Sequence, residues 1–107
     1  MQRRMLIWIL LPALVLPVCI FAAGDAEKGK EVFSRCGFCH GDSGEGKETV
    51  AKALGVTMRP LSSKEVQSLG DAALKKIINE GKGKMRPSNL SDQDAADVIA
   101  FLRTLKK

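Results

Sequence analysis

The sequence predicts an all-α fold, and three observations support this prediction. Apolar residues recur every three or four positions in several short segments, which is the spacing of one face of a helix. Residues that cap helices, namely Ser, Asp and Gly, stand at the ends of these segments. No β-rich run occurs anywhere in the chain. We therefore expect three to five short helices in one small domain.

The first 22 residues are predicted to be a secretory signal peptide. Residues 2–4 include two arginines, and residues 5–21 are apolar apart from two prolines. Ala22 and Ala23 then provide small residues for cleavage. The apolar run is close to the length of a membrane-spanning helix, so an uncleaved N-terminal anchor is the alternative. Cleavage near Ala22 would release a soluble periplasmic protein, whereas retention would tie it to the membrane.

Residues 23–107 then form one domain, which we expect to be monomeric. A domain of this size has a thin hydrophobic core and usually needs a further stabilising group. The chain has 17 basic and 12 acidic residues, and removing Arg3 and Arg4 leaves 15 basic residues and a net charge of +3. This small excess, with few aromatic side chains to stack on bases, argues against nucleic-acid binding.

The first helix is expected from Asp25 to Arg35, with Asp25 as its N-cap. Glycine inside a helix costs about 1 kcal/mol relative to alanine, so Gly29 indicates close approach by another element, or a tolerated glycine in a short exposed helix. The residues at helical spacing on its inner side are Gly29, Val32, Phe33 and Cys36.

The helix leads into Cys36-Gly37-Phe38-Cys39-His40, and a C-x-x-C-H run is the pattern of covalent haem attachment. We expect Cys36 and Cys39 to form thioethers with the vinyl groups of one haem c, and His40 to be the proximal axial ligand of its iron. A structural zinc site needs four N or S ligands, but residues 23–107 contain no further Cys or His. A thioredoxin-like C-x-x-C belongs near a βαβ pattern, which is absent here.

Residues 41–46 have the composition of a surface loop. Residues 48–55 are expected to form one or two helical turns. We expect their inward-facing side chains to be Val50, Ala53 and Leu54. Ser62 and Glu65 then fit a capping box at the start of a further helix, which is expected to stop near Gly70.

Asp71 is predicted to cap the next helix, and Gly81 to end it. Its apolar face consists of Leu74, Ile77 and Ile78. Residues 81–87 should form an irregular loop that presents Met85. The last helix is predicted to begin after the N-cap Ser91 and to have a broad apolar face made of Ala95, Val98, Ile99, Phe101, Leu102 and Leu105.

The distal haem ligand decides what such a haem does. His40 is the only histidine in the chain, so a second imidazole is excluded. Met85 follows His40 by 45 residues and lies in a glycine-rich loop, which gives it enough chain to reach the other face of the haem. Met58 follows by only 18 residues. We predict Met85 as the distal ligand, with Met58 as the weaker alternative.

The sequence resembles a small bacterial class I c-type cytochrome over nearly the whole of residues 23–107. The matching features are the C-x-x-C-H motif, Gly29 and Phe33 before it, the G-K-G-K-M loop, and Val98 and Phe101 in the last helix. The resemblance implies a soluble monohaem electron carrier with His40 and Met85 as axial ligands. It also implies that the first and last helices cross, with Gly29 and Phe33 against Val98, Phe101 or Leu102.

Two departures from the pattern of that family stand out. Arg86 separates Met85 from Pro87, where the family usually has Pro directly after the ligand Met. No proline occurs between His40 and Pro60, so the acceptor for the imidazole N–H is not identified. The haem propionates must be satisfied by Arg59, Arg86, lysines, hydroxyls or backbone N–H groups.

The expected function is one-electron transfer in the periplasm without conversion of a substrate, so we expect no enzyme activity. The expected partners are redox donor and acceptor proteins that dock near Lys82, Lys84 and Arg86, although such charges also serve simply to keep a surface soluble. Two other functions stay open. One is a haem enzyme or gas-binding sensor with an open or labile sixth position, and the other is a membrane-anchored electron-entry module of a larger redox complex.

Overall fold

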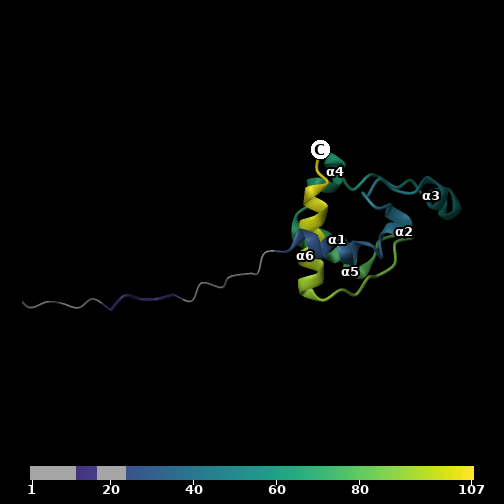
Figure 1. Cartoon of the computed structure of the whole chain (residues 1–107). Helices are drawn as coiled ribbons and strands as arrows, with labels where there is room; N and C mark the ends of the chain where they lie inside the picture. Colours follow the sequence, from purple (N-terminus) through teal and green to yellow (C-terminus); the bar gives the residue numbers. More distant parts are fainter. Residues whose placement is uncertain (1–11, 17–23) are drawn as a thin grey trace, which may run out of the picture.

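The computed structural model describes residues 12–16 and 24–107 (Figure 1). Within these residues the structure is helical and contains no strand, which confirms the all-α prediction. It has more helices than the three to five expected, because two of them are single turns of four residues. The six helices are α1 (Ala26–Phe33), α2 (Gly37–His40), α3 (Glu48–Leu54), α4 (Lys64–Gln67), α5 (Asp71–Glu80) and α6 (Asp92–Thr104).

Most of the predicted signal peptide, residues 1–22, lies outside the described residues; only residues 12–16 of it are described, and they form no regular element. In the two described segments, no helix is long and apolar enough to cross a membrane. The domain boundary near residue 23 therefore stays a prediction.

Helices α1 and α6 pack directly against each other, as the resemblance implied. Gly29 makes this possible, because a Cβ atom there would overlap the Asp97 carbonyl group of α6. Phe33 at the end of α1 meets Phe101 of α6, with ring centroids 5.1 Å apart and ring planes tilted by 50°. Such tilted aromatic pairs add to the stability that burial provides.

The start of α1 is also attached to α6 through Asp97. Asp25 caps α1 by accepting hydrogen bonds from the backbone of Glu27 and Lys28, as predicted. Its own amide donates to the Asp97 carboxylate at 2.8 Å, and the Gln93 side chain donates to the same oxygen at 2.8 Å. These two donors hold the pKa of the buried Asp97 carboxyl below its ordinary value.

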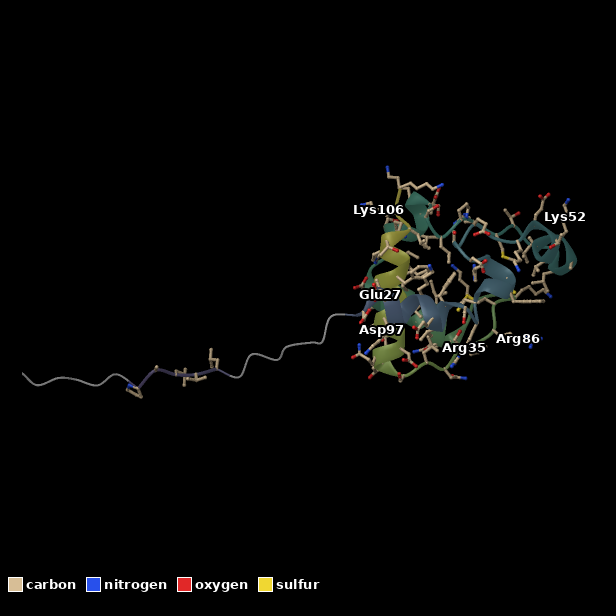
Figure 2. All side chains as sticks on the ribbon, viewed as in Figure 1. Glu27, Arg35, Lys52, Arg86, Asp97 and Lys106 are labelled. Atoms are coloured by element: carbon tan, nitrogen blue, oxygen red, sulfur yellow. The ribbon has the colours of Figure 1, made fainter. Side chains whose placement is uncertain are left out.

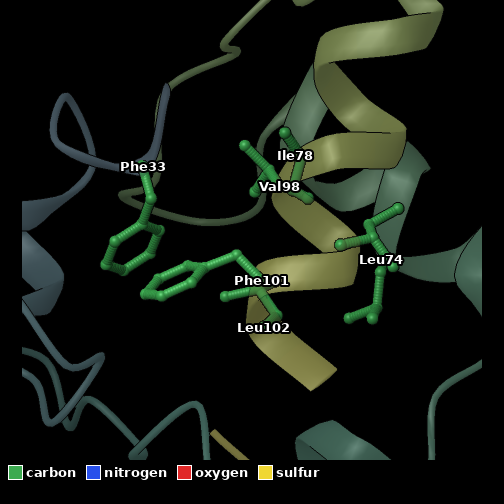
Figure 3. Close-up of a cluster of buried hydrophobic side chains, with 7 residues drawn as sticks. Phe33, Leu74, Ile78, Val98, Phe101 and Leu102 are labelled. Carbon is green, nitrogen blue, oxygen red and sulfur yellow. The ribbon is translucent and has the colours of Figure 1, made fainter. Parts of the chain in front are cut away.

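The hydrophobic core lies around α6, between α1 and α5 (Figure 3). The periodicity of α6 predicted this face correctly, although Leu105 at its end is only half-buried. On α5, Leu74 and Ile78 are buried, whereas Ile77 is half-buried. The buried cluster consists of Phe33, Leu74, Ile78, Val98, Ile99, Phe101 and Leu102. Neither α2 nor α3 contributes a residue to this cluster, so the side of the domain that carries these two helices needs another group to pack against.

Polar contacts connect the α4 segment to the last turn of α6. The Arg103 guanidinium donates to the carbonyls of Gln67 at 2.9 Å and Leu69 at 2.6 Å. It also forms an ion pair with the Asp71 carboxylate at 2.7 Å. The Gln67 side chain donates to the carbonyls of Leu61 and Leu102 at 2.9 and 2.8 Å.

Two of the predicted N-caps are wrong by one residue. Ser63 rather than Ser62 caps α4, accepting from the Val66 amide, because a turn that bonds the Ser63 amide to the Pro60 carbonyl precedes the helix. Gly70 rather than Asp71 is the N-cap of α5, since Asp71 is already helical and its carboxylate pairs with Arg103.

The inner face of α3 agrees with the prediction in part. Val50 and Leu54 line the cavity described below, whereas Ala53 is exposed and Ala51 is the buried residue of the helix. The reason is tertiary: α3 lies at the edge of the domain, beyond α2 and away from the core around α6 (Figure 1). A short helix with two apolar sides cannot reveal from its own spacing which side meets the rest of the chain.

Candidate haem site

A cavity of about 780 Å³ lies among α2, α3 and the loop between α5 and α6. This volume falls in the range of sites that bind cofactors and other small molecules. Much of its wall is apolar, which suits a large hydrophobic group. The apolar residues of the wall, besides the methionines and cysteines, are Val32, Phe38, Val50, Leu54, Val56, Pro87 and Leu90.

The C-x-x-C-H motif forms one side of this cavity. The chain turns after α1 through a bond from the Cys36 amide to the Phe33 carbonyl at 2.8 Å. The His40 amide then bonds to the Cys36 carbonyl at 2.9 Å, so the motif closes a helical turn. Residues three and four apart lie on one helix face, and accordingly Cys36, Cys39 and His40 all line the cavity. Both thiols are free and half-buried.

The loop of residues 41–46, predicted from its composition, holds α2 in place. The Gly46 amide donates to the His40 carbonyl at 2.7 Å, and the Lys47 amide donates to the Cys39 carbonyl at 2.9 Å. These bonds satisfy the last carbonyls of α2, which have no partner within so short a helix. These bonds fix the backbone of the motif beside the cavity.

His40 has the properties of a side chain that binds a group from outside the polypeptide. Its Nδ1 atom is buried and, among the described residues, has no hydrogen-bond partner. Buried polar atoms in proteins are rarely left unpaired. Burial also lowers the pKa of the His40 imidazole, which favours the neutral form that coordinates metals. The acceptor for the imidazole N–H that the sequence did not identify is also absent from the described residues.

Both candidate methionines lie on the cavity wall. Met85 closes a tight turn with Lys82: their backbones exchange two hydrogen bonds, of 3.1 and 2.9 Å. Gly83 inside this turn has a φ of +57°, which glycine adopts without strain. Met58 follows α3 and packs against Gly46. It also lines a second cavity of about 240 Å³, while no hydrogen bond within residues 24–107 holds its backbone.

The charged side chains on the cavity wall are all cations: Arg35, Lys82, Lys84 and Arg86. None of them takes part in the three ion pairs found among the described residues. Figure 2 shows Arg35 and Arg86 on the side of the domain that carries α2. Sequence reasoning did not single out Arg35, although its place next to Cys36 was a usable signal. Arg59, expected near the propionates, is exposed and is not part of the wall.

Comparison with protein-family models identifies the family of this chain. The model described as "Cytochrome c" matches residues 26–106. The chain belongs to the cytochrome c family. A cytochrome c binds haem c covalently and serves in electron transfer, so both properties hold for this chain.

A solved structure supports the same assignment. The KustC0563 c-type cytochrome is 26% identical to this cytochrome c, with a TM-score of 0.62 over 74% of this chain and 98% of that one. Comparison with curated protein sequences finds no significant match.

The residues at the cavity fit a haem. Two free thiols and a buried imidazole lie on one wall, and among the described residues the imidazole Nδ1 has no hydrogen-bond partner. The volume suits a large apolar group, and the cations on the wall suit its two carboxylates. A metal bound by protein side chains alone has less support, because in the part of the chain that the structure describes no cluster of three or more His, Cys, Asp and Glu side chains could hold one.

Proposed function

We propose that this cytochrome c is a one-electron carrier in which Cys36 and Cys39 form the haem thioethers and His40 and Met85 are the two axial ligands. The observation that carries the proposal is that these four side chains line one cavity. The chain contains no second histidine, so methionine is the strong ligand available for the other face of the haem.

Each residue has a distinct role in this proposal. The haem supplies an iron that changes oxidation state by one electron. Cys36 and Cys39 hold it to α2, and His40 provides an imidazole nitrogen from the same helical turn. The soft sulfur of Met85 favours the ferrous state and so raises the reduction potential. With both axial positions occupied by protein, no position is left at which a substrate could bind, so we propose that the protein is not an enzyme.

Met85 is preferred over Met58 because its backbone is better held. The turn between Lys82 and Met85 is closed by two hydrogen bonds, whereas the Met58 backbone has none within residues 24–107. A ligand on an ordered turn loses less conformational freedom when it binds the iron. Met58 also borders the smaller cavity behind α3, where it has the simpler role of filling space.

We also propose that the protein is exported and acts in the periplasm after cleavage near Ala22. Support comes from the N-terminal sequence pattern and from the use of both remaining cysteines in one motif. The anchored alternative is also compatible with electron transfer. Gly24 packs on α6, on the opposite side of the domain from α3 (Figure 1), so an N-terminal anchor would leave the cavity side free.

The ferrous holoprotein is expected not to bind carbon monoxide rapidly at neutral pH, because Met85 occupies the sixth position. The measurement is the change in the haem absorption spectrum after the gas is mixed with the reduced protein. The Met85→Ala variant serves as the positive control and should bind the gas stoichiometrically. Fast, stoichiometric binding by the unmodified protein would contradict the carrier function and favour a haem enzyme or gas sensor.

The partners that we propose are acidic redox proteins, donors and acceptors, which dock at Lys82, Lys84, Arg86 and Arg35. These four cations line the cavity without an ion-pair partner among the described residues. A cluster of one sign raises the association rate of an oppositely charged partner and gives that rate a dependence on salt. Nothing in the charge pattern favours a nucleic acid.

Two inorganic oxidants of opposite charge test this cluster without a natural partner. Oxidation of the ferrous protein by hexacyanoferrate(III), an anion, should slow as salt is raised, whereas oxidation by the cation tris(1,10-phenanthroline)cobalt(III) should accelerate. Lys84→Gln should slow the reaction with the anion by about two- to threefold at low salt. Lys107→Gln, at the exposed chain end, is the matched control. Rates that do not respond to salt would exclude steering by this surface.

A further inference from the structure

Within residues 24–107, no hydrogen bond from the turn of residues 82–85 reaches the rest of the domain. The two bonds between Lys82 and Met85 close the turn on itself. After α5 the chain runs out toward α2 and then returns to α6 (Figure 1). A loop of this kind opens locally unless its two ends are held. The contacts at its ends therefore decide where Met85 lies.

Both ends of the loop are held by the last turn of α5. At the outgoing end, the Gly81 amide donates to the Ile77 carbonyl at 2.8 Å. At the returning end, the Ser88 amide donates to the Ile78 carbonyl at 2.9 Å. Two residues later, the Leu90 amide donates to the side-chain oxygen of Asn79 at 2.8 Å. Among the described residues, Asn79 provides the one side-chain hydrogen bond to this loop.

The bond from Leu90 to Asn79 acts at the point where the loop meets both the core and the cavity. Leu90 is half-buried, packs against the core cluster and also lines the cavity. Asn79 is half-buried as well, and its carboxamide is not part of the cavity wall. Its influence on the haem must therefore pass through the backbone of the loop.

We infer that Asn79 is a positioning residue for Met85: by holding the returning end of the loop it keeps the methionine sulfur at the iron. This inference rests on the proposed ligation by Met85. One neutral hydrogen bond corresponds to roughly a fivefold change in an equilibrium constant. Loss of the Asn79 acceptor should therefore raise the fraction of molecules with an open sixth position about fivefold, and an added ligand should bind correspondingly better.

The test is a titration of the ferric holoprotein with imidazole, followed by the weak long-wavelength sulfur-to-iron band. Asn79→Ala should lower the apparent Kd for imidazole about fivefold. Asn79→Asp keeps an oxygen acceptor and should bind imidazole as the unmodified protein does. A carboxylate at the C-terminal end of α5 interacts unfavourably with the helix dipole and should lower the stability of the domain. If imidazole affinity merely followed overall stability, Asn79→Asp would therefore bind imidazole more tightly as well.

Gln67→Ala is the matched control for stability, because it removes the bonds to the Leu61 and Leu102 carbonyls and the bond accepted from Arg103, and none of these three partners belongs to the loop. It should lower the resistance to denaturant and leave the imidazole affinity unchanged. Equal affinities for Asn79→Ala and the unmodified protein would overturn the inference, as would an equal gain in Gln67→Ala. If the unmodified ferric protein shows no sulfur-to-iron band, Met85 is not the axial ligand, and the role proposed for Asn79 is then wrong as well.

Discussion

Met85→Ala is expected to abolish the long-wavelength sulfur-to-iron band of the ferric holoprotein and to lower its reduction potential. The thioether sulfur stabilises ferrous iron, and axial ligands set haem potentials over a range of roughly 0.8 V. Replacement by water or a weak oxygen ligand should lower the potential by on the order of 0.1–0.3 V. The measurements are the ferric optical spectrum and a potentiometric titration.

Met58→Ala is the matched control, because it removes the other methionine from the same cavity wall. It should keep the band and nearly the same potential, with a small loss of stability from the lost side chain. If the band disappears only in Met58→Ala, Met58 rather than Met85 is the axial ligand. Mass spectrometry of each variant should show that the haem is still covalently attached, so that loss of the band cannot be due to loss of the haem.

Gly29→Ala is expected to be the most destabilising single substitution in the α1–α6 contact. A Cβ atom at this position would overlap the backbone carbonyl of Asp97, and backbone cannot move aside as a flexible side chain can. The helices would have to separate, which would also disturb the contact between Phe33 and Phe101. We expect a loss of about 3 kcal/mol or more in the free energy of unfolding, measured by denaturant unfolding of the holoprotein.

Gly70→Ala is the matched control for this substitution. A Cβ atom at residue 70 meets nothing within 4 Å, and its φ of −69° suits any residue. The effect should stay within about 1 kcal/mol, because the loss of a good N-cap is offset by the lower entropy of the unfolded chain. If Gly29→Ala lowers the free energy of unfolding no more than Gly70→Ala does, that result would contradict the close contact between α1 and α6 at Gly29.

Local chemistry made much of the fold predictable. Asp25 and Ser91 cap α1 and α6 as expected, and Gly81 ends α5. Each of these residues acts on backbone groups within four positions of itself, so the sequence around it contains all the partners. The same holds for the C-x-x-C-H turn, in which chemistry and spacing are contained within five residues.

The predictions were wrong where a residue far away in the sequence determines the local structure. Asp71 was expected to cap α5, but its carboxylate pairs with Arg103, 32 residues away. Ala51 rather than Ala53 is the buried alanine of α3, because the side of that helix that meets the rest of the domain depends on where the chain places it. Periodicity predicts that a helix has an apolar face; it does not identify what covers the face.

The sequence by itself determined the C-x-x-C-H motif, the helical class and the residues of the α6 core face, and it predicts methionine as the second axial ligand. The tertiary structure alone decided that both methionines reach one cavity, that Arg35 joins Lys82, Lys84 and Arg86 on its wall, and that Asn79 holds the loop of Met85. The physical reason is distance along the chain. Capping, helix periodicity and covalent attachment act over a few residues, whereas a cavity and its charge are made by segments that meet only after the whole chain has folded.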